Sequence, residues 1–315
     1  MLATKSMFCA DPAFAATGGT ITYIPSGDSS SGSTQVHTFL GDGTFNINRN
    51  TSCNVLCVAG GGGGSSGHYG GGGGAGGFRT VAGTSLNGSY TVDIGAGGAE
   101  QGTFNQPGNE GESSSMGSVL VCSGGGRGGY NTTTDATTGG SGGGGGGGGD
   151  AGGTTAGNSG GYSPVEGYYG TNKVSGTSYG GGAGGGAGGI AGATADYKGA
   201  NGGKGAANTY RTGSTVYYSG GGGGASYLDN AFSSAHTNHS QGGYSSDGTA
   251  TGGSETTKGG GGDGSQYSNS GLHATGEAGA TNTGGGGGGA EGHHASDQDG
   301  PAGGSGIVVI TFTIP

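Results

Sequence analysis

Basic residues and long apolar runs are scarce in this sequence, and tryptophan is absent. Only 9 of the 315 residues are Lys or Arg, against 19 Asp and Glu, and the net charge is −10. Proteins that hold nucleic acid neutralise its phosphates with clustered Lys and Arg, whereas the few basic residues here are scattered. No apolar run approaches the length that spans a bilayer. We therefore predict that the protein binds no nucleic acid and inserts no segment into a membrane.

Apolar residues, proline and cysteine are also few. At 28% of the chain, the hydrophobic residues are too few for an ordinary core in a protein of this length. Proline numbers only 6 and the glycine spacing is irregular, which excludes a collagen triple helix. Of the four cysteines, Cys53 and Cys57 alternate with Val55 on one face of a predicted strand, too far apart to bridge without distortion. Their spacing is not that of a zinc site. We expect one small core, reduced cysteines, no metal and no cofactor.

Glycine dominates instead, with 94 residues and an uninterrupted run at residues 142–149. Glycine has no side chain to bury and the largest backbone entropy to lose, so the folded state must gain its stability from the backbone. The polyproline-II helix has three residues per turn and outward-pointing amides, so packed glycine helices can bond to neighbours on all sides. We predict such a polyglycine II lattice, organised around residues 142–149, in which any interior side chain would block the packing. Flexible linker and disordered chain are the alternatives.

Peripheral helices of such a lattice need glycine only on the inward side. This predicts glycine at every third position, and residues 186–194 show that spacing. Residues 199–207 resume it after a shift of register.

Strand-like segments frame the glycine. Residues 18–24 alternate as a short strand, and Gly41-Asp-Gly predicts a hairpin between residues 35–40 and 44–48. The apolar residues 305–315 predict a closing strand that pairs with this hairpin. His37 is expected to lie half exposed in its strand.

In four places a strand runs directly into glycine, at residues 59–60, 94–95, 123–124 and 219–220. A linker would not repeat this pattern. The sequence therefore predicts a mainly β fold with little or no α-helix, in which a small β-sandwich merges with the lattice. We expect residues 1–17 to form an N-terminal arm that could dock on a partner, and residues 18–315 to form a single domain.

The order of these motifs resembles the glycine-rich domain family of bacteriophage virion proteins and environmental bacteria. The resemblance rests on residues 18–22 (GGTIT), 36–39 (VHTF), 55–64 (VLCVAGGGGG), 90–98 (YTVDIGAGG) and 303–310 (GGSGIVVI). The strand-to-glycine pattern is more distantly similar to the glycine-rich ectodomain of anaplastic lymphoma kinase receptors, which implies a jelly-roll-like sandwich merged with a polyglycine II lattice. The glycine runs separated by polar loops also look similar to the tail-fibre tip adhesins of T-even-like phages.

Loops rich in tyrosine interrupt the glycine at residues 162–179, 227–244 and 266–273. Tyrosine offers broad contact at small entropic cost, while Ser, Asn and Gly adapt their hydrogen bonds. These side chains either bind a ligand or seal the edges of the lattice. The candidate binding residues are Tyr162, Tyr168, Tyr169, Tyr179, Tyr227, Tyr244, His236 and His239.

Patterns that would indicate an enzyme are weak. Ser141 and Ser159 lie in G-x-S-x-G matches, but neither match follows a predicted strand and precedes a helix, as a nucleophile elbow requires. His293 and His294 are adjacent and would point in opposite directions in an extended chain, which disfavours a shared metal. We expect no enzymatic activity.

The sequence as a whole favours a non-enzymatic virion protein, a tail-fibre or capsid-fibre component whose loops recognise host surface glycans. Its expected partners are other virion proteins and further copies of itself. The alternative is an extracellular filament or matrix protein of a bacterium, located outside the cell or on its surface. An ice-binding protein is a third alternative, because a flat Ala/Thr face such as residues 186–194 could order water.

Overall fold

A computed structural model describes most of the chain, and it contains strands and irregular segments but no helix in the described residues. The mainly β fold without α-helix is thus confirmed. No helix that could cross a membrane occurs in this part of the chain. The described residues are 14–130, 136–147, 154–172, 179–193, 198–228, 259–268, 273–292 and 299–315.

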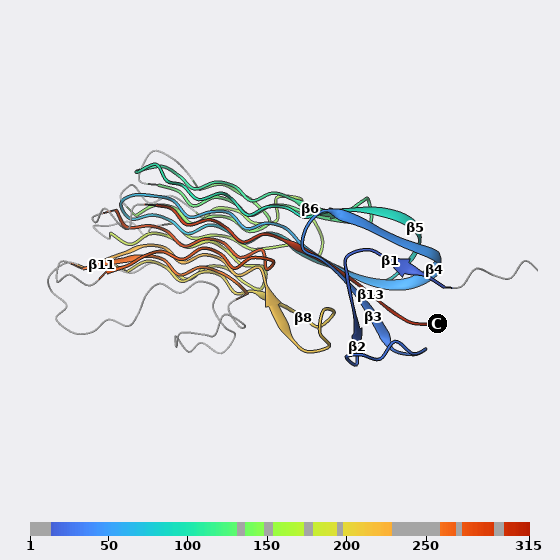
Figure 1. Ribbon diagram of the computed structural model, residues 1–315. Coiled ribbons are helices and arrows are strands. Elements are labelled where there is room, and N and C mark those ends of the chain that lie inside the picture. The colour runs from blue at the N-terminus through green and yellow to red at the C-terminus, as the bar shows by residue number, and fades with distance from the viewer. Residues whose placement is uncertain are drawn as a thin grey trace, which may run out of the picture.

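The molecule has two parts, a β-sheet region at one end and a long body of glycine-rich segments that run side by side away from it (Figure 1). An eight-stranded sheet lies in the first part, and two small sheets, β8–β9 and β10–β11–β12, accompany the second. The strands are β1 (Ala16–Thr17), β2 (Thr20–Ile24), β3 (Thr34–Phe39), β4 (Gly43–Val58), β5 (Phe78–Asp93), β6 (Ser114–Met116), β7 (Leu120–Cys122), β8 (Ala206–Asn208), β9 (Val216–Tyr218), β10 (Ser226–Leu228), β11 (Gln266–Ser268), β12 (His273–Ala274) and β13 (Ile307–Thr313).

The C-terminal strand β13 lies inside the large sheet, between β3 and β4. The order is β2-β3-β13-β4-β5-β6-β7, with β1 paired to β4. Pairing of β13 with β3 is confirmed, but the predicted hairpin is wrong, because β13 separates β3 from β4 and pairs with residues 54–58 of the latter. A strand that is apolar on both faces is best buried at the centre of a sheet, with a neighbour on each edge.

The antiparallel pair of long strands β4 and β5 folds over about halfway along its length. β5 begins directly after glycine at residue 77 and ends just before glycine at residue 95, so both of its ends face the glycine body. Register shifts fall in β4 between residues 47 and 55, and Gly83 and Gly88 of β5 have positive φ. Bulges and positive-φ glycines allow such a bend. The two layers of the predicted sandwich are therefore parts of one continuous sheet.

The main hydrophobic core fills the space inside this folded sheet. It joins Phe45 of one layer to Val55, Ile310 and Phe312 of the other. The alternate residues of β13, Ile307 and Val309, face a second, smaller core that β9 covers with Tyr218. Phe14 packs edge-on against Phe312, and Ala16 pairs with Ile47, so residues 14–17 of the predicted arm contact the sheet. Residues 1–13 lie outside the described part.

The cysteines of the sheet are buried and free. Cys53, Val55 and Cys57 face the same core, as predicted from their alternation, and Cys122 of β7 joins them. Burial raises the pKa of Cys53 to about 12 and that of Cys122 well above its ordinary value. The thiols of Cys53 and Cys122 are therefore protonated and poorly reactive at neutral pH.

His37 is fully buried, so the prediction of a half-exposed histidine is wrong. Its Nδ1 donates to the carbonyl oxygen of Gly18 at 2.7 Å, and its Nε2 accepts from the Gln35 side-chain amide at 3.0 Å. Its ring also lies against Phe45 and Phe312. Both ring nitrogens are satisfied in the neutral form, which is why a strand can bury this side chain.

The burial of His37 makes stability depend on pH. Desolvation lowers the pKa of His37 below its ordinary value of 6.5, so the unfolded chain binds this proton more readily. The contribution of neutral His37 is complete above pH 6.5 and is lost as pH falls below 6.5 towards the folded pKa, by up to about 1.4 kcal/mol per pH unit. Urea unfolding at pH 7.5 and pH 5.5 should show a larger loss for the parent than for His37→Gln. Equal losses in both proteins would contradict this assignment.

The glycine body is a lattice, and residues 70–77 lie at its centre. Their main-chain N–H groups donate to three neighbouring segments in rotation. Every third residue donates to the same neighbour: residues 70, 73 and 76 to segment 284–290, residues 71, 74 and 77 to segment 123–129, and residues 72 and 75 to segment 182–185. A period of three is that of the polyproline-II helix.

The carbonyl groups of residues 70–77 accept from three further segments, at residues 59–65, 141–144 and 222–225. Six segments therefore surround the central one. Segment 182–185 runs parallel to it and segment 123–129 antiparallel. All four predicted passages from strand into glycine are confirmed, because β4, β5, β7 and β9 each lead into such a segment. This arrangement is a packed polyglycine II lattice.

The longest glycine run is not the centre. Residues 142–147 form part of one of the six neighbours, and residues 148 and 149 lie outside the described part. Gly145 is half-buried, and a Cβ added to it would meet the side chain of Asn172. Whether a segment is enclosed depends on how many other segments pack around it. The length of its glycine run does not determine that number.

The interior also accepts small side chains, contrary to our expectation. Ala75 belongs to the central segment and is fully buried, as is Ser65 on the adjacent one. Alanine and serine carry the two smallest side chains after glycine, so the close-packed lattice can enclose them at these two positions.

The predicted peripheral helix at residues 186–194 is wrong, because Gly186 pairs with Gly189 across a turn.

Candidate functional site

A turn at residues 67–69 closes the lattice at its far end, which is the end away from the sheet. Segment 60–66 leaves β4 and segment 70–77 returns to β5, so this turn lies at the greatest distance along the chain from both strands. Gly67 and Tyr69 have positive φ, which reverses the chain between two packed helices. His68 and Tyr69 are the only large side chains between the flanking glycines.

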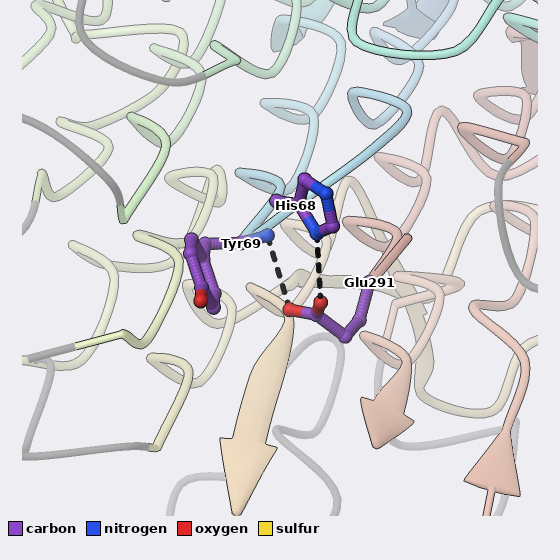
Figure 2. A network of polar contacts seen from close by, with 3 residues as sticks. All are labelled: His68, Tyr69 and Glu291. Carbon is purple, nitrogen blue, oxygen red and sulfur yellow. Dashed lines mark hydrogen bonds and ion pairs between the residues drawn. The ribbon is translucent and has the colours of Figure 1, made fainter. Parts of the chain in front are cut away.

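A buried carboxylate holds this turn in place (Figure 2). The Tyr69 main-chain N–H donates to Oε2 of Glu291 at 3.1 Å, and Nδ1 of His68 lies 3.6 Å from Oε1. The Glu291 side chain is fully enclosed, whereas His68 is partly exposed. A carboxylate oxygen that accepts a main-chain N–H fixes the backbone at that residue. Glu291 thus orients the aromatic pair of the turn.

Aromatic rings from four separate parts of the chain meet at this end. Tyr69 lies 5.0 Å from Tyr179 and 5.7 Å from Tyr227, measured between ring centroids, and these two lie 5.8 Å apart. His68 meets Phe104 edge-on at 5.3 Å. We call these five residues the far-end aromatic cluster. Phe104 and Tyr179 are each more than a third exposed, so the cluster offers aromatic surface to solvent.

The sequence-predicted binding residues divide among three places. Tyr179 and Tyr227 belong to the far-end aromatic cluster. Tyr162 lies near the sheet, where the guanidinium of Arg79 stacks over its ring at 3.6 Å. Tyr168 and Tyr169 are exposed on the flank of the lattice. Tyr244, His236 and His239 lie outside the described residues, as do His293 and His294.

Tyr168 and Tyr169 belong to the lattice itself rather than to a free loop. The carbonyl of Tyr168 accepts from Gly142, and that of Tyr169 accepts from Ala191. Part of the predicted loop at residues 162–179 is therefore a glycine-rich segment with exposed tyrosines. Ser141, one of the two serines in a G-x-S-x-G match, is fully buried in the lattice, and residues 142–147, which follow it, are not helical.

Sequence reasoning missed His68, Tyr69 and Phe104, and it placed Glu291 in a solvated loop, whereas its side chain is buried and anchors the turn. The pattern that could have found the first two is the short interruption SSGHY between two glycine runs. A pair of packed glycine segments needs a turn, and the residues of that turn are presented at the end of the lattice. No local pattern predicts that Glu291 binds this turn, because its partner Tyr69 is 222 residues away in the sequence. Among the described residues, no group of three or more His, Cys, Asp or Glu could hold a metal ion.

The model of a family described as "Glycine-rich domain" matches residues 33–271. The chain belongs to this glycine-rich domain family. The match includes β3, β4 and β5 together with most of the lattice, whereas β13 lies beyond it. No curated protein matches the chain. The glycine-rich domain therefore accounts for both the sheet strands and the lattice that they feed.

Proposed function

We propose that this protein is a non-enzymatic component of a bacteriophage virion, a tail fibre or capsid fibre that binds host surface glycans through the far end of its glycine lattice. The observation that carries the proposal is the far-end aromatic cluster, which a backbone-bonded lattice holds far from the sheet. Aromatic rings stack on the apolar faces of sugars, and rings that are already fixed lose little entropy on binding.

The opposite end suits attachment. β1 and β13 both lie in the sheet, so the described ends of the chain are at the end opposite the aromatic cluster (Figure 1). Contacts with other virion proteins and with further copies of the chain would be made there. Membership of the glycine-rich domain family is compatible with a virion location, and the resemblance to phage proteins supports it.

Replacing Tyr179 and Tyr227 together by alanine should lower binding to a glycan array or to host cells at least about tenfold. Aromatic anchors at the centre of an interface usually dominate its affinity. The unfolding transition should stay nearly unchanged, because the lattice is held by its backbone. Tyr162→Ala is the matched control, since this tyrosine lies near the sheet, and it should bind as the parent does.

Two results would contradict the proposal. Binding by the double variant equal to that of the parent would show that the far-end aromatic cluster has no role in recognition. A parent protein that binds no cell surface and no glycan would favour a purely structural role.

A further inference from the structure

A hollow lies on the flank of the lattice, away from the far-end aromatic cluster. It has a volume of about 250 Å³ and is lined by Ile190, Gly192, Asn201, Gly202 and Lys204. Drug-sized ligands occupy pockets of about 300–1,000 Å³, so this hollow suits a smaller group, such as a single sugar ring.

The walls of the hollow are fixed by the backbone. The N–H of Gly192 donates to the carbonyl of Asn201 at 2.8 Å, and that of Gly188 donates to Lys204 at 2.7 Å. A Cβ added to Gly189 would lie 3.8 Å from the aliphatic carbons of Lys204, so the stem of this lysine runs alongside the turn. The site is therefore preformed, which reduces the entropy that a ligand must overcome.

The lining combines an apolar surface with a cation. Ile190 is 60% exposed, the largest exposed fraction among the large apolar side chains that the structure describes. The ammonium group of Lys204 makes no ion pair or hydrogen bond with the part of the chain described here. Asn201 also lines the hollow. An exposed apolar side chain beside an ammonium group that has no partner among the described residues matches a ligand with an apolar face and one acidic group.

We propose that this hollow is a subsite for a hexuronic acid residue of an otherwise neutral glycan. The apolar face of the pyranose ring would rest on Ile190, and its carboxylate would meet the Lys204 ammonium. The net charge of −10 disfavours a highly charged polymer, so an isolated acidic sugar fits better than a polyanion. The proposal rests on the proposed function, because it specifies the class of glycan that is bound.

Binding of methyl β-glucuronide and of methyl β-glucoside, measured by ligand-observed NMR, tests this assignment. The two probes share a ring and differ in the carboxylate. The parent should bind the glucuronide at least about threefold more tightly, and Lys204→Gln should remove this preference. Lys198→Gln, an exposed lysine that does not line the hollow, is the matched control and should keep it. Ile190→Ser should weaken binding of both probes.

A parent that binds neither probe at about 10 mM, or that binds both equally, would overturn the subsite. A preference that persists in Lys204→Gln would overturn it as well. The outcome is separable from that of the far-end aromatic cluster. Cell binding that depends on Tyr179 and Tyr227 would stand even if the hollow took no sugar.

Discussion

Gly73→Val is expected to lower the free energy of unfolding by about 3 kcal/mol or more. A Cβ at this position would lie less than 3.0 Å from the carbonyl oxygens of Gly62 and Gly63. These two oxygens already accept from the N–H groups of Gly287 and Gly128, which belong to two further segments, so their own segment cannot move aside without breaking those bonds. Differential scanning calorimetry should record a large fall in melting temperature, or the loss of a cooperative transition.

Two other valine substitutions test whether the loss of stability is specific to the enclosed position or follows from any valine in a glycine-rich chain. A Cβ on Gly41 would meet nothing within 4 Å, so Gly41→Val should change stability by less than about 0.5 kcal/mol. Gly145→Val should fall between the two, since the neighbouring Asn172 side chain can rotate away. If Gly73→Val melts at the temperature of the parent, the central segment is not enclosed.

The sequence allowed the class of the fold to be predicted because its signals there are local. Alternating apolar residues marked β2 and β3, and the abrupt change from strand to glycine marked the ends of β4, β5, β7 and β9. The same alternation placed Cys53 and Cys57 on one buried face. Each of these features depends only on residues a few positions apart.

Features that depend on long-range pairing could not be predicted in this way. The glycine turn at residues 41–43 is compatible with a hairpin, and only the position of β13, more than 250 residues later, shows that β3 and β4 are separated. His37 is buried because Gly18 and Gln35 satisfy its ring nitrogens. Which segment lies at the centre of the lattice depends on the positions of the six segments around it. No local sequence pattern predicts those positions.

The candidate site was predicted only in part for the same reason. Tyr179 and Tyr227 stood out by composition, and both belong to the far-end aromatic cluster. Tyr168 and Tyr169 had the same composition around them but lie on the flank. Which tyrosines converge is decided by which lattice segments end at the same place.

Amide hydrogen exchange of residues 70–77 should be among the slowest in the protein. All eight main-chain N–H groups of this segment donate to carbonyl oxygens, at 2.7 to 3.0 Å. To expose these N–H groups to solvent, several neighbouring helices must separate together. Their exchange should therefore follow global unfolding rather than local fluctuation. A disordered glycine-rich chain of the same composition would exchange at its intrinsic rate.

The most direct test of the lattice is therefore hydrogen–deuterium exchange, followed by mass spectrometry on peptides that include residues 70–77. The packed polyglycine II lattice predicts exchange at least about a thousandfold slower than the intrinsic rate of the unfolded chain, as expected for a domain of ordinary stability. Exchange of these peptides at the intrinsic rate would contradict the lattice.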